Sequence, residues 1–210
     1  MKGSNVSATA RLRRSPVDPV PVQRKTILSK ADEILKEIER TAESKYLPIV
    51  GPEKGRVLVK IVRETAPKRV LEVGTLVGYS AILMGKELGS ETRFIGIEID
   101  DEEARIALRN VERAEIPPTV EVIVGDAKEV IPKLAGKFDL VFVDAKKNEY
   151  LEYLRLVEAK LHKGSTIVAD NAGKYANQMK DYLGYVRSSG KYRSRFVAVG
   201  QDGLEISVKL

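Results

Sequence analysis

The chain has 210 residues, of which 43% are hydrophobic and 31% are charged, a composition typical of one globular domain with a full core. It contains no cysteine and a single histidine, His162, which excludes disulfides, thiolate zinc sites and poly-histidine metal sites. Any metal must therefore be held by oxygen ligands, which favours Mg²⁺, Ca²⁺ or Mn²⁺. No apolar run is long enough for a membrane-spanning helix and no secretory signal is recognisable, so we expect a cytoplasmic protein without membrane association.

The net charge of +6 is concentrated at the N-terminus, where residues 1–25 carry six basic side chains against Asp18 alone. This segment is rich in Ser, Pro and Arg and lacks periodicity, so we predict an extended basic arm over 1–25 and one domain over 26–210. Such an arm is suited to contact RNA or an acidic subunit, or it contacts nothing.

Two helices are predicted before any strand. Apolar residues between Thr26 and Ser44 recur at helical spacing, and a second helix is expected to begin near Pro52 and to end near Thr65.

The pattern then changes to short runs rich in Val, Ile and Phe, at 69–73, 93–99, 120–124, 139–144 and 165–170. Amphipathic stretches separate or follow them near 79–88, 101–114, 127–134, 148–161 and 174–187. This alternation predicts a parallel sheet with helices on both faces. Residues 195–200 and 204–210 flank Gln201-Asp202-Gly203 and predict a final antiparallel hairpin. The expected fold is therefore α/β, with the outline of a Rossmann-like class I methyltransferase.

A glycine-containing loop follows the first predicted strand, with the pattern Glu72-x-Gly74-x-x-x-Gly78. It is not the dinucleotide fingerprint, because Glu72 and Val77 stand where that fingerprint has glycines, and a carboxylate would repel a pyrophosphate. S-adenosylmethionine has no phosphate and carries two positive charges, which suits Glu72. Glu98 lies 20 residues past Gly78, where an acid can accept hydrogen bonds from both ribose hydroxyls. A tight turn with a solvated glutamate is the simpler alternative.

Asp144 ends the fourth predicted strand, and Asp170 with Asn171 ends the fifth. If these strands are neighbours they run about 5 Å apart, so two carboxylates and an amide oxygen can share one hard cation. The alternative is that both acids cap the helical segments that follow them. Lys147 lies three residues after Asp144 and is a candidate general base, although Lys146 beside it is an equally available lysine.

At these residues the chain resembles the cation-dependent O-methyltransferases, the family of catechol O-methyltransferase. The resemblance covers about residues 26–210 and rests on seven segments in the expected order: YLPIVGPEKG, LEVGTLVGYSA, IEID, VGDAKEVIP, FDLVFVDAKKNEYL, ADN and DGLE.

The resemblance implies roles for individual residues. Around S-adenosylmethionine it assigns Val50 and Ser80 to the methionine end, Glu98 to the ribose, and Ile99 to cofactor binding without a particular part of the cofactor. The adenine is assigned to Gly125, Asp126, Ala127 and Lys128, while Glu72, Gly74, Gly78 and Asp144 complete the cofactor set. For the chemistry it assigns Asp144, Asp170 and Asn171 to the metal, Lys147 to proton removal and Glu205 to the acceptor's second hydroxyl.

The chain departs from the family pattern in three places. Lys146 replaces an aromatic residue, and Tyr46 and Tyr175 stand where the animal enzyme has the Trp and Pro beside its acceptor. The natural acceptor is therefore left open.

The function implied is methyl transfer from S-adenosylmethionine, with Mg²⁺ or another hard divalent cation, to a catechol-like small molecule with two adjacent oxygens. An alternative acceptor is 5-hydroxyuridine in tRNA, with the basic arm contacting phosphates. A non-catalytic binding or assembly protein would need neither Lys147 nor Glu205. Whether the protein forms a homodimer is left open.

Overall fold

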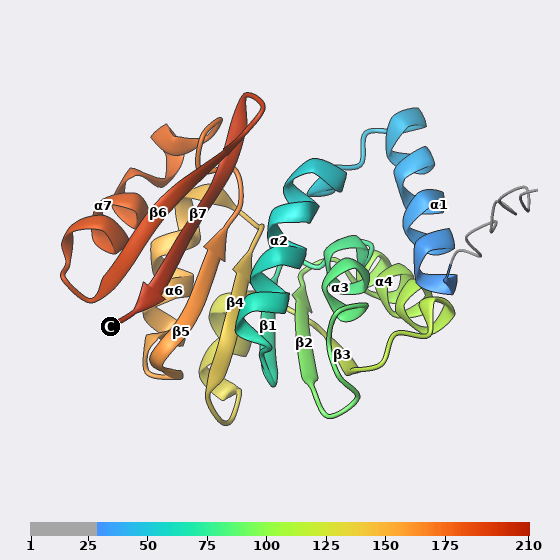
Figure 1. The fold of residues 1–210 in the computed structure, drawn as a ribbon, viewed down its shortest axis with the longest axis horizontal. Helices are drawn as coiled ribbons and strands as arrows, with labels where there is room; N and C mark the ends of the chain where they lie inside the picture. Colours follow the sequence, from blue (N-terminus) through green and yellow to red (C-terminus); the bar gives the residue numbers. More distant parts are fainter. Residues whose placement is uncertain (1–28) are drawn as a thin grey trace, which may run out of the picture.

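A computed structural model describes residues 29–210, so the basic arm predicted over 1–25 lies outside the described residues (Figure 1). The centre of the described part of the chain is a seven-stranded sheet with the strand order β3-β2-β1-β4-β5-β7-β6. The strands are β1 Arg69–Val73, β2 Arg93–Glu98, β3 Thr119–Val124, β4 Phe138–Val143, β5 Leu161–Ala169, β6 Tyr192–Val199 and β7 Asp202–Lys209. β1 to β5 pair in parallel and β7 pairs antiparallel with both β5 and β6, which confirms the predicted fold class.

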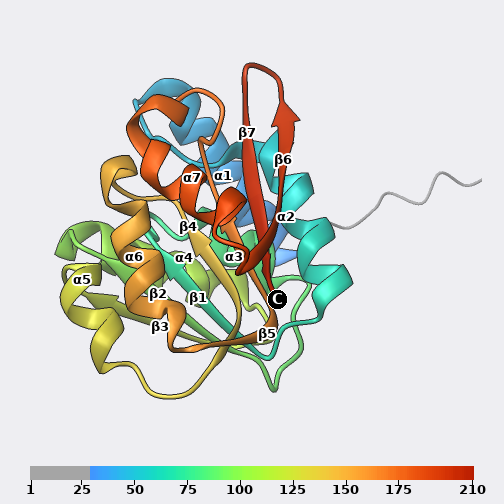
Figure 2. The same ribbon diagram turned by 90° about the vertical axis from the view of Figure 1, so that its left-hand side faces the viewer.

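Helices cover both faces of this sheet (Figure 2). The α-helices are α1 Lys30–Ser44, α2 Gly51–Thr65, α3 Tyr79–Gly85, α4 Asp101–Ala114, α5 Ala127–Val130, α6 Tyr150–Glu158 and α7 Lys180–Ser188. Short 3₁₀ turns η1 Ile131–Lys133, η2 Lys147–Glu149 and η3 Ala176–Met179 precede or follow some of them. None of the helices in residues 29–210 has the length and apolar character needed to cross a membrane.

Alternation along the strands divides the core into two layers. Leu140 and Phe142 of β4 pack with α1 to α4, whereas Val141 and Val143 pack with α5, α6 and α7. Successive side chains of a strand point to opposite faces, so a central strand buried on both sides has to be apolar at every position. The run FDLVFV meets this requirement over most of its length.

Several element boundaries differ from the sequence-based expectation: α3 ends at Gly85 instead of residue 88, α7 begins at Lys180 instead of residue 174, and β6 begins at Tyr192 instead of residue 195. α6 ends at Glu158 and β5 already begins at Leu161, although a helix was expected up to residue 161. The hairpin turns at Gly200 and Gln201 because Val199 pairs with Asp202, so Asp202 and Gly203 belong to β7 instead of the turn. Gly200 has φ 57°, the left-handed conformation that a tight turn needs.

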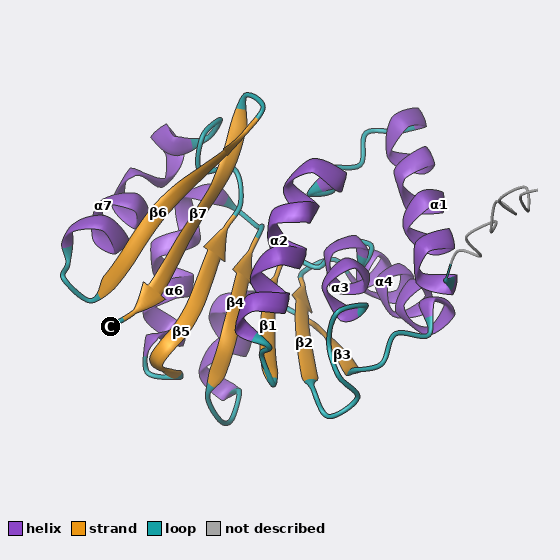
Figure 3. Ribbon diagram, in the orientation of Figure 1, coloured by secondary structure: helices purple, strands orange, loops and turns teal. Residues whose placement is uncertain are grey.

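The carboxyl ends of the parallel strands lie along one edge of the sheet, which is the upper edge in Figure 3. Strand order reverses around β1, since β2 lies on one side of it and β4 on the other. Ligands of open α/β sheets bind at such a switch point, outside the carboxyl ends of the strands. α2 begins at this same edge (Figure 3).

Gly74 lets the loop after β1 pass close to the end of β4. Its φ is 90°, and a Cβ there would lie 2.2 Å from the backbone oxygen of Asp144. We expect Gly74→Ala to lower the free energy of unfolding by about 3 kcal/mol, through backbone strain and overlap. Gly184→Ala, at an open position of α7, is the control and should be neutral or stabilising by up to about 1 kcal/mol. Urea denaturation of both variants tests this, and equal effects would contradict it.

Candidate active site

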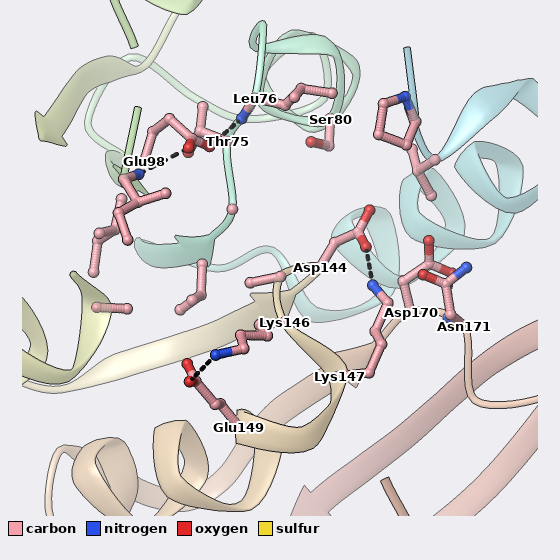
Figure 4. Close-up of a pocket in the computed structure, with 18 of the residues that line it drawn as sticks. Thr75, Leu76, Ser80, Glu98, Asp144, Lys146, Lys147, Glu149, Asp170 and Asn171 are labelled. Atoms are coloured by element: carbon pink, nitrogen blue, oxygen red, sulfur yellow. Dashed lines mark hydrogen bonds and ion pairs between the residues drawn. The ribbon is translucent and has the colours of Figure 1, made fainter. Parts of the chain in front are cut away.

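A cavity of about 720 Å³ lies at the carboxyl edge of the sheet, a size typical of small-molecule sites. It is lined by the loops after β1, β2, β3, β4 and β5, together with the segment from Tyr46 to Lys54 that leads into α2 (Figure 4). Most of the predicted site residues line it: Tyr46, Val50, Gly74, Ser80, Glu98, Ile99, Gly125, Asp126, Ala127, Lys128, Asp144, Lys147, Asp170, Asn171 and Tyr175.

Glu98, at the end of β2, is held by backbone amides. Its Oε2 accepts a hydrogen bond from the Leu76 N–H at 2.7 Å, and its Oε1 accepts from Ile99 at 2.8 Å and from Asp100 at 3.1 Å. Leu76 reaches this position with φ 50°, which is uncommon for a residue other than glycine. The loop after β1 and the end of β2 are therefore tied together, with a fixed carboxylate in the cavity wall.

Glu72 corrects one expectation, because it lies beneath the cavity and does not line it. It is fully buried on the α3 side of the sheet, where Ser80 Oγ donates a hydrogen bond to its Oε1 and its Oε2 has no partner among the described residues. Burial raises the pKa of Glu72 to about 8, so the side chain is mostly neutral at pH 7. In the described structure its contact is with Ser80, which does line the cavity.

Gly78 also lies outside the cavity lining. It is the N-cap of α3 with φ 85°, and a Cβ there would come within 3.1 Å of the Ala107 backbone in α4. Because Gly78 has no side chain, the start of α3 can pack closely against α4. Its position shows a packing role and no contact with the cavity.

Asp144 and Asp170 do come together, as the strand ends predict. Val143 of β4 pairs with Ala169 of β5, so each acid directly follows one member of a paired position. Neither caps a helix, because η2 and η3 begin at Lys147 and Ala176 without a side-chain cap. Burial, followed by the negative charge of Asp144, raises the pKa of Asp170 to about 7. Two acids in these surroundings need positive charge nearby to be ionised together.

Lysines supply positive charge to both acids, and Figure 4 shows Lys147 directed at Asp144. Lys147 Nζ lies 2.8 Å from Asp144 Oδ1 and 3.0 Å from the Tyr150 hydroxyl. Lys54, on the first turn of α2, donates to both oxygens of Asp170 at 2.6 Å and to Asp202 Oδ2 at 3.2 Å. Lys54 and Asp202 were missed in the sequence analysis, because only the packing of α2 and of the hairpin brings them to Asp170.

Lys146 points away from this pair of acids. It binds Glu149 at 2.9 Å, and Glu149 also accepts from Lys128 at 3.2 Å and from the Tyr153 hydroxyl at 2.6 Å. The Lys146 contact is the main reason why the pKa of Glu149 falls to about 2. Of the two adjacent lysines, only Lys147 is therefore directed at Asp144.

Glu205 is the third predicted residue that lies outside this cavity. Leu204 and Ile206 point into the core layer of α1 to α4, so Glu205 between them faces α7. There it is fully buried and forms two hydrogen bonds with Arg187, at 2.9 and 2.7 Å. A buried acid already satisfied by an arginine fork is not available to an acceptor hydroxyl.

The donor set at the strand ends fits a hard divalent ion. Asn171 Nδ2 donates to Asp202 Oδ2 at 2.7 Å, which directs the amide nitrogen to Asp202 and leaves Oδ1 as the ligand atom. Asn171 adopts φ 62°, a conformation that asparagine tolerates better than most residues. Within residues 29–210 no three His, Cys, Asp or Glu side chains are grouped for a metal, so the set depends on the Asn171 amide.

Comparison with known proteins identifies the family. The model of the O-methyltransferase family matches residues 25–181. The chain is 36% identical over 174 residues to catechol O-methyltransferase B of Danio rerio, covering 77% of this chain and 65% of that protein. It is 34% identical over 172 residues to catechol O-methyltransferase of Sus scrofa, covering 76% of this chain and 91% of that protein.

Among solved structures, the O-methyltransferase of Bacillus cereus in complex with SAH superimposes with a TM-score of 0.78 at 25% identity, covering 85% of this chain and 91% of that one. The fold is thus that of class I methyltransferases, and the chain belongs to the O-methyltransferase family. The match spans just under two thirds of the Danio rerio protein.

The buried acid Glu72 makes stability depend on pH. Its pKa is about 4.5 in the unfolded chain and about 8 in the folded protein, so folding takes up a proton between these pH values. The contribution of this proton uptake to the free energy of unfolding is complete below about pH 4.5 and is lost as the pH rises through about 8. We expect Glu72→Gln to abolish that loss, so the variant gains stability relative to the wild type, by at most about 1.4 kcal/mol per pH unit, between pH 6 and 8. Chemical denaturation at a series of pH values measures the difference. Parallel pH profiles would show that Glu72 is ionised in the folded protein.

Proposed function

We propose that the protein transfers the methyl group of S-adenosylmethionine to a hydroxyl of a small molecule with two adjacent oxygens, assisted by a divalent ion on Asp144, Asp170 and Asn171. One observation carries the proposal: the ends of two neighbouring parallel strands bring two acids and Lys147 into the same cavity as Glu98 and the loop after β1.

Membership of the O-methyltransferase family and the SAH complex of the Bacillus cereus relative support S-adenosylmethionine as the methyl donor. SAH is what remains of this donor after the methyl group has left. The Glu98 carboxylate suits the ribose hydroxyls, and the loop has no glycine pattern for a pyrophosphate. Gly125 to Lys128 would lie along the adenine, on the side of Glu149.

Asp144, Asp170 and Asn171 would hold the ion through three oxygens and leave further positions open to water and acceptor. When bound, a divalent ion lowers the pKa of an acceptor hydroxyl and stabilises the oxyanion.

Lys147 would remove the proton from the acceptor hydroxyl. Its Nζ already lies 2.8 Å from Asp144, which brings it beside the acceptor oxygen if that oxygen binds next to Asp144. The Tyr150 hydroxyl, whose pKa burial raises well above the usual value, stays protonated and positions the lysine. Oxygen and methyl carbon held in line supply much of the remaining acceleration.

The two adjacent lysines provide a matched pair of variants. Lys147→Met should lower kcat by roughly 10²- to 10⁴-fold, the usual contribution of a positioned base, without a change in fold. Lys146→Met is the control and should retain most of the activity, because Lys146 is bonded to Glu149. Initial rates with saturating donor test this. If the loss follows Lys146 instead, the proton-removal role is assigned to the wrong lysine.

The acceptor is best identified by transfer of labelled methyl groups from S-adenosylmethionine to a panel of catechols and to bulk tRNA, with Mg²⁺ or with EDTA. We expect transfer to catechols that requires Mg²⁺. Full activity in EDTA would defeat the role of the metal, and labelling of tRNA alone would replace the small molecule by a nucleic acid. No described residue favours the tRNA alternative, because the basic arm lies outside the described residues.

A further inference from the structure

Lys54 makes the shortest contacts to either of the two strand-end acids. Its Nζ donates to both oxygens of Asp170 at 2.6 Å, and only 15% of the lysine side chain is exposed. The side chain of Asp170 is 2% exposed, so its charge has little access to water. A charge-assisted contact of this kind is strong, because the carboxylate has no solvent alternative.

The position of Lys54 is set by the fold. Gly55, the next residue, packs against α3, where an added Cβ would lie 2.5 Å from Leu83 Cδ2. Val50, at the start of α2, is buried in the core. The first turn of α2 is therefore anchored on both sides of Lys54, which confines its ammonium group to the region of Asp170.

Asp202 offers Lys54 a second carboxylate. Its Oδ2 lies 3.2 Å from Lys54 Nζ and accepts from Asn171 Nδ2, while its Oδ1 accepts the backbone N–H groups of Gly173 at 3.2 Å and Lys174 at 2.9 Å. Asp202 is thus held in place by neighbours that do not depend on Lys54. It touches both the lysine and the amide that completes the proposed metal set.

A divalent ion bound to Asp170 would be repelled by the ammonium group of Lys54 in its present position. An ion about 2.1 Å from either Asp170 oxygen would lie within about 5 Å of the ammonium group, and both cations would compete for the same oxygens. The conflict is relieved if Lys54 moves from Asp170 to Asp202, which it already contacts.

We propose that Lys54 is an internal counter-ion of the metal site, which neutralises Asp170 in the metal-free protein and is displaced to Asp202 when a divalent ion binds. The proposal rests on the metal role of Asp144, Asp170 and Asn171 in the proposed function. Metal binding is then an exchange of cations. Lys54 lowers the affinity for the divalent ion, and Asp202 raises it. Both are positioning residues, because they act through the ligands.

The test is calorimetric titration of Mn²⁺ into metal-free protein, without donor or acceptor. Lys54→Gln removes the competing charge and keeps a hydrogen-bond donor, so Kd should fall roughly tenfold or more. Asp202→Asn removes the acceptor for the displaced lysine and weakens the hold on Asn171, so Kd should rise several-fold. Lys174→Met is the control for general electrostatics, because the Lys174 side chain lines the cavity but forms no hydrogen bond or ion pair with Asp170, and it should change Kd far less.

Thermal unfolding in EDTA and in saturating Mn²⁺ gives a second readout. Lys54→Gln should destabilise the metal-free protein and should gain more from Mn²⁺ than the wild type does. An unchanged or higher Kd for Lys54→Gln, or an unchanged Kd for Asp202→Asn, would overturn the exchange while leaving the metal site intact. Absence of Mn²⁺ binding by the wild type would overturn both the metal role and this inference.

Discussion

The chemistry of the cavity depends on two acids that share one edge of a parallel sheet. Asp144 and Asp170 follow paired positions of β4 and β5, and burial with mutual repulsion raises the pKa of Asp170 to about 7. Buried acids in this arrangement are costly unless positive charge accompanies them. Lys147 and Lys54 provide it in the protein alone. The same demand for positive charge is what makes the edge suitable for a divalent ion.

The rest of the cavity wall is held close to this edge by the loop after β1 and by Glu98. The loop after β1 approaches Asp144 closely because Gly74 has no side chain, and the same loop is tied to Glu98 through the Leu76 amide. The parts of the cavity proposed for donor and acceptor thus adjoin at the carboxyl edge of the central strands, where the strand order reverses. Glu72 supports this loop from below through Ser80 as a mostly neutral acid. Family membership and geometry together favour methyl transfer, while the acceptor is a matter for assay.

Local patterns predicted the fold and most of the cavity, because strand ends of a parallel sheet necessarily meet at one edge. Lys54 could not be found in this way, since its position depends on how α2 packs on α3. Glu205 was misassigned by resemblance although the alternation with Leu204 and Ile206 already directs it to the opposite face. The hairpin turn was predicted two residues too late in the chain, because Asp202-Gly203 is a dipeptide typical of turns although it lies in β7.

The most direct test of the central claim is a crystal structure grown with Mn²⁺ and SAH, in which anomalous scattering locates the ion. We predict one strong peak within about 2.4 Å of carboxylate oxygens from both Asp144 and Asp170 and of the Asn171 amide oxygen. A peak elsewhere, or no peak while the ammonium group of Lys54 remains on Asp170, would contradict it.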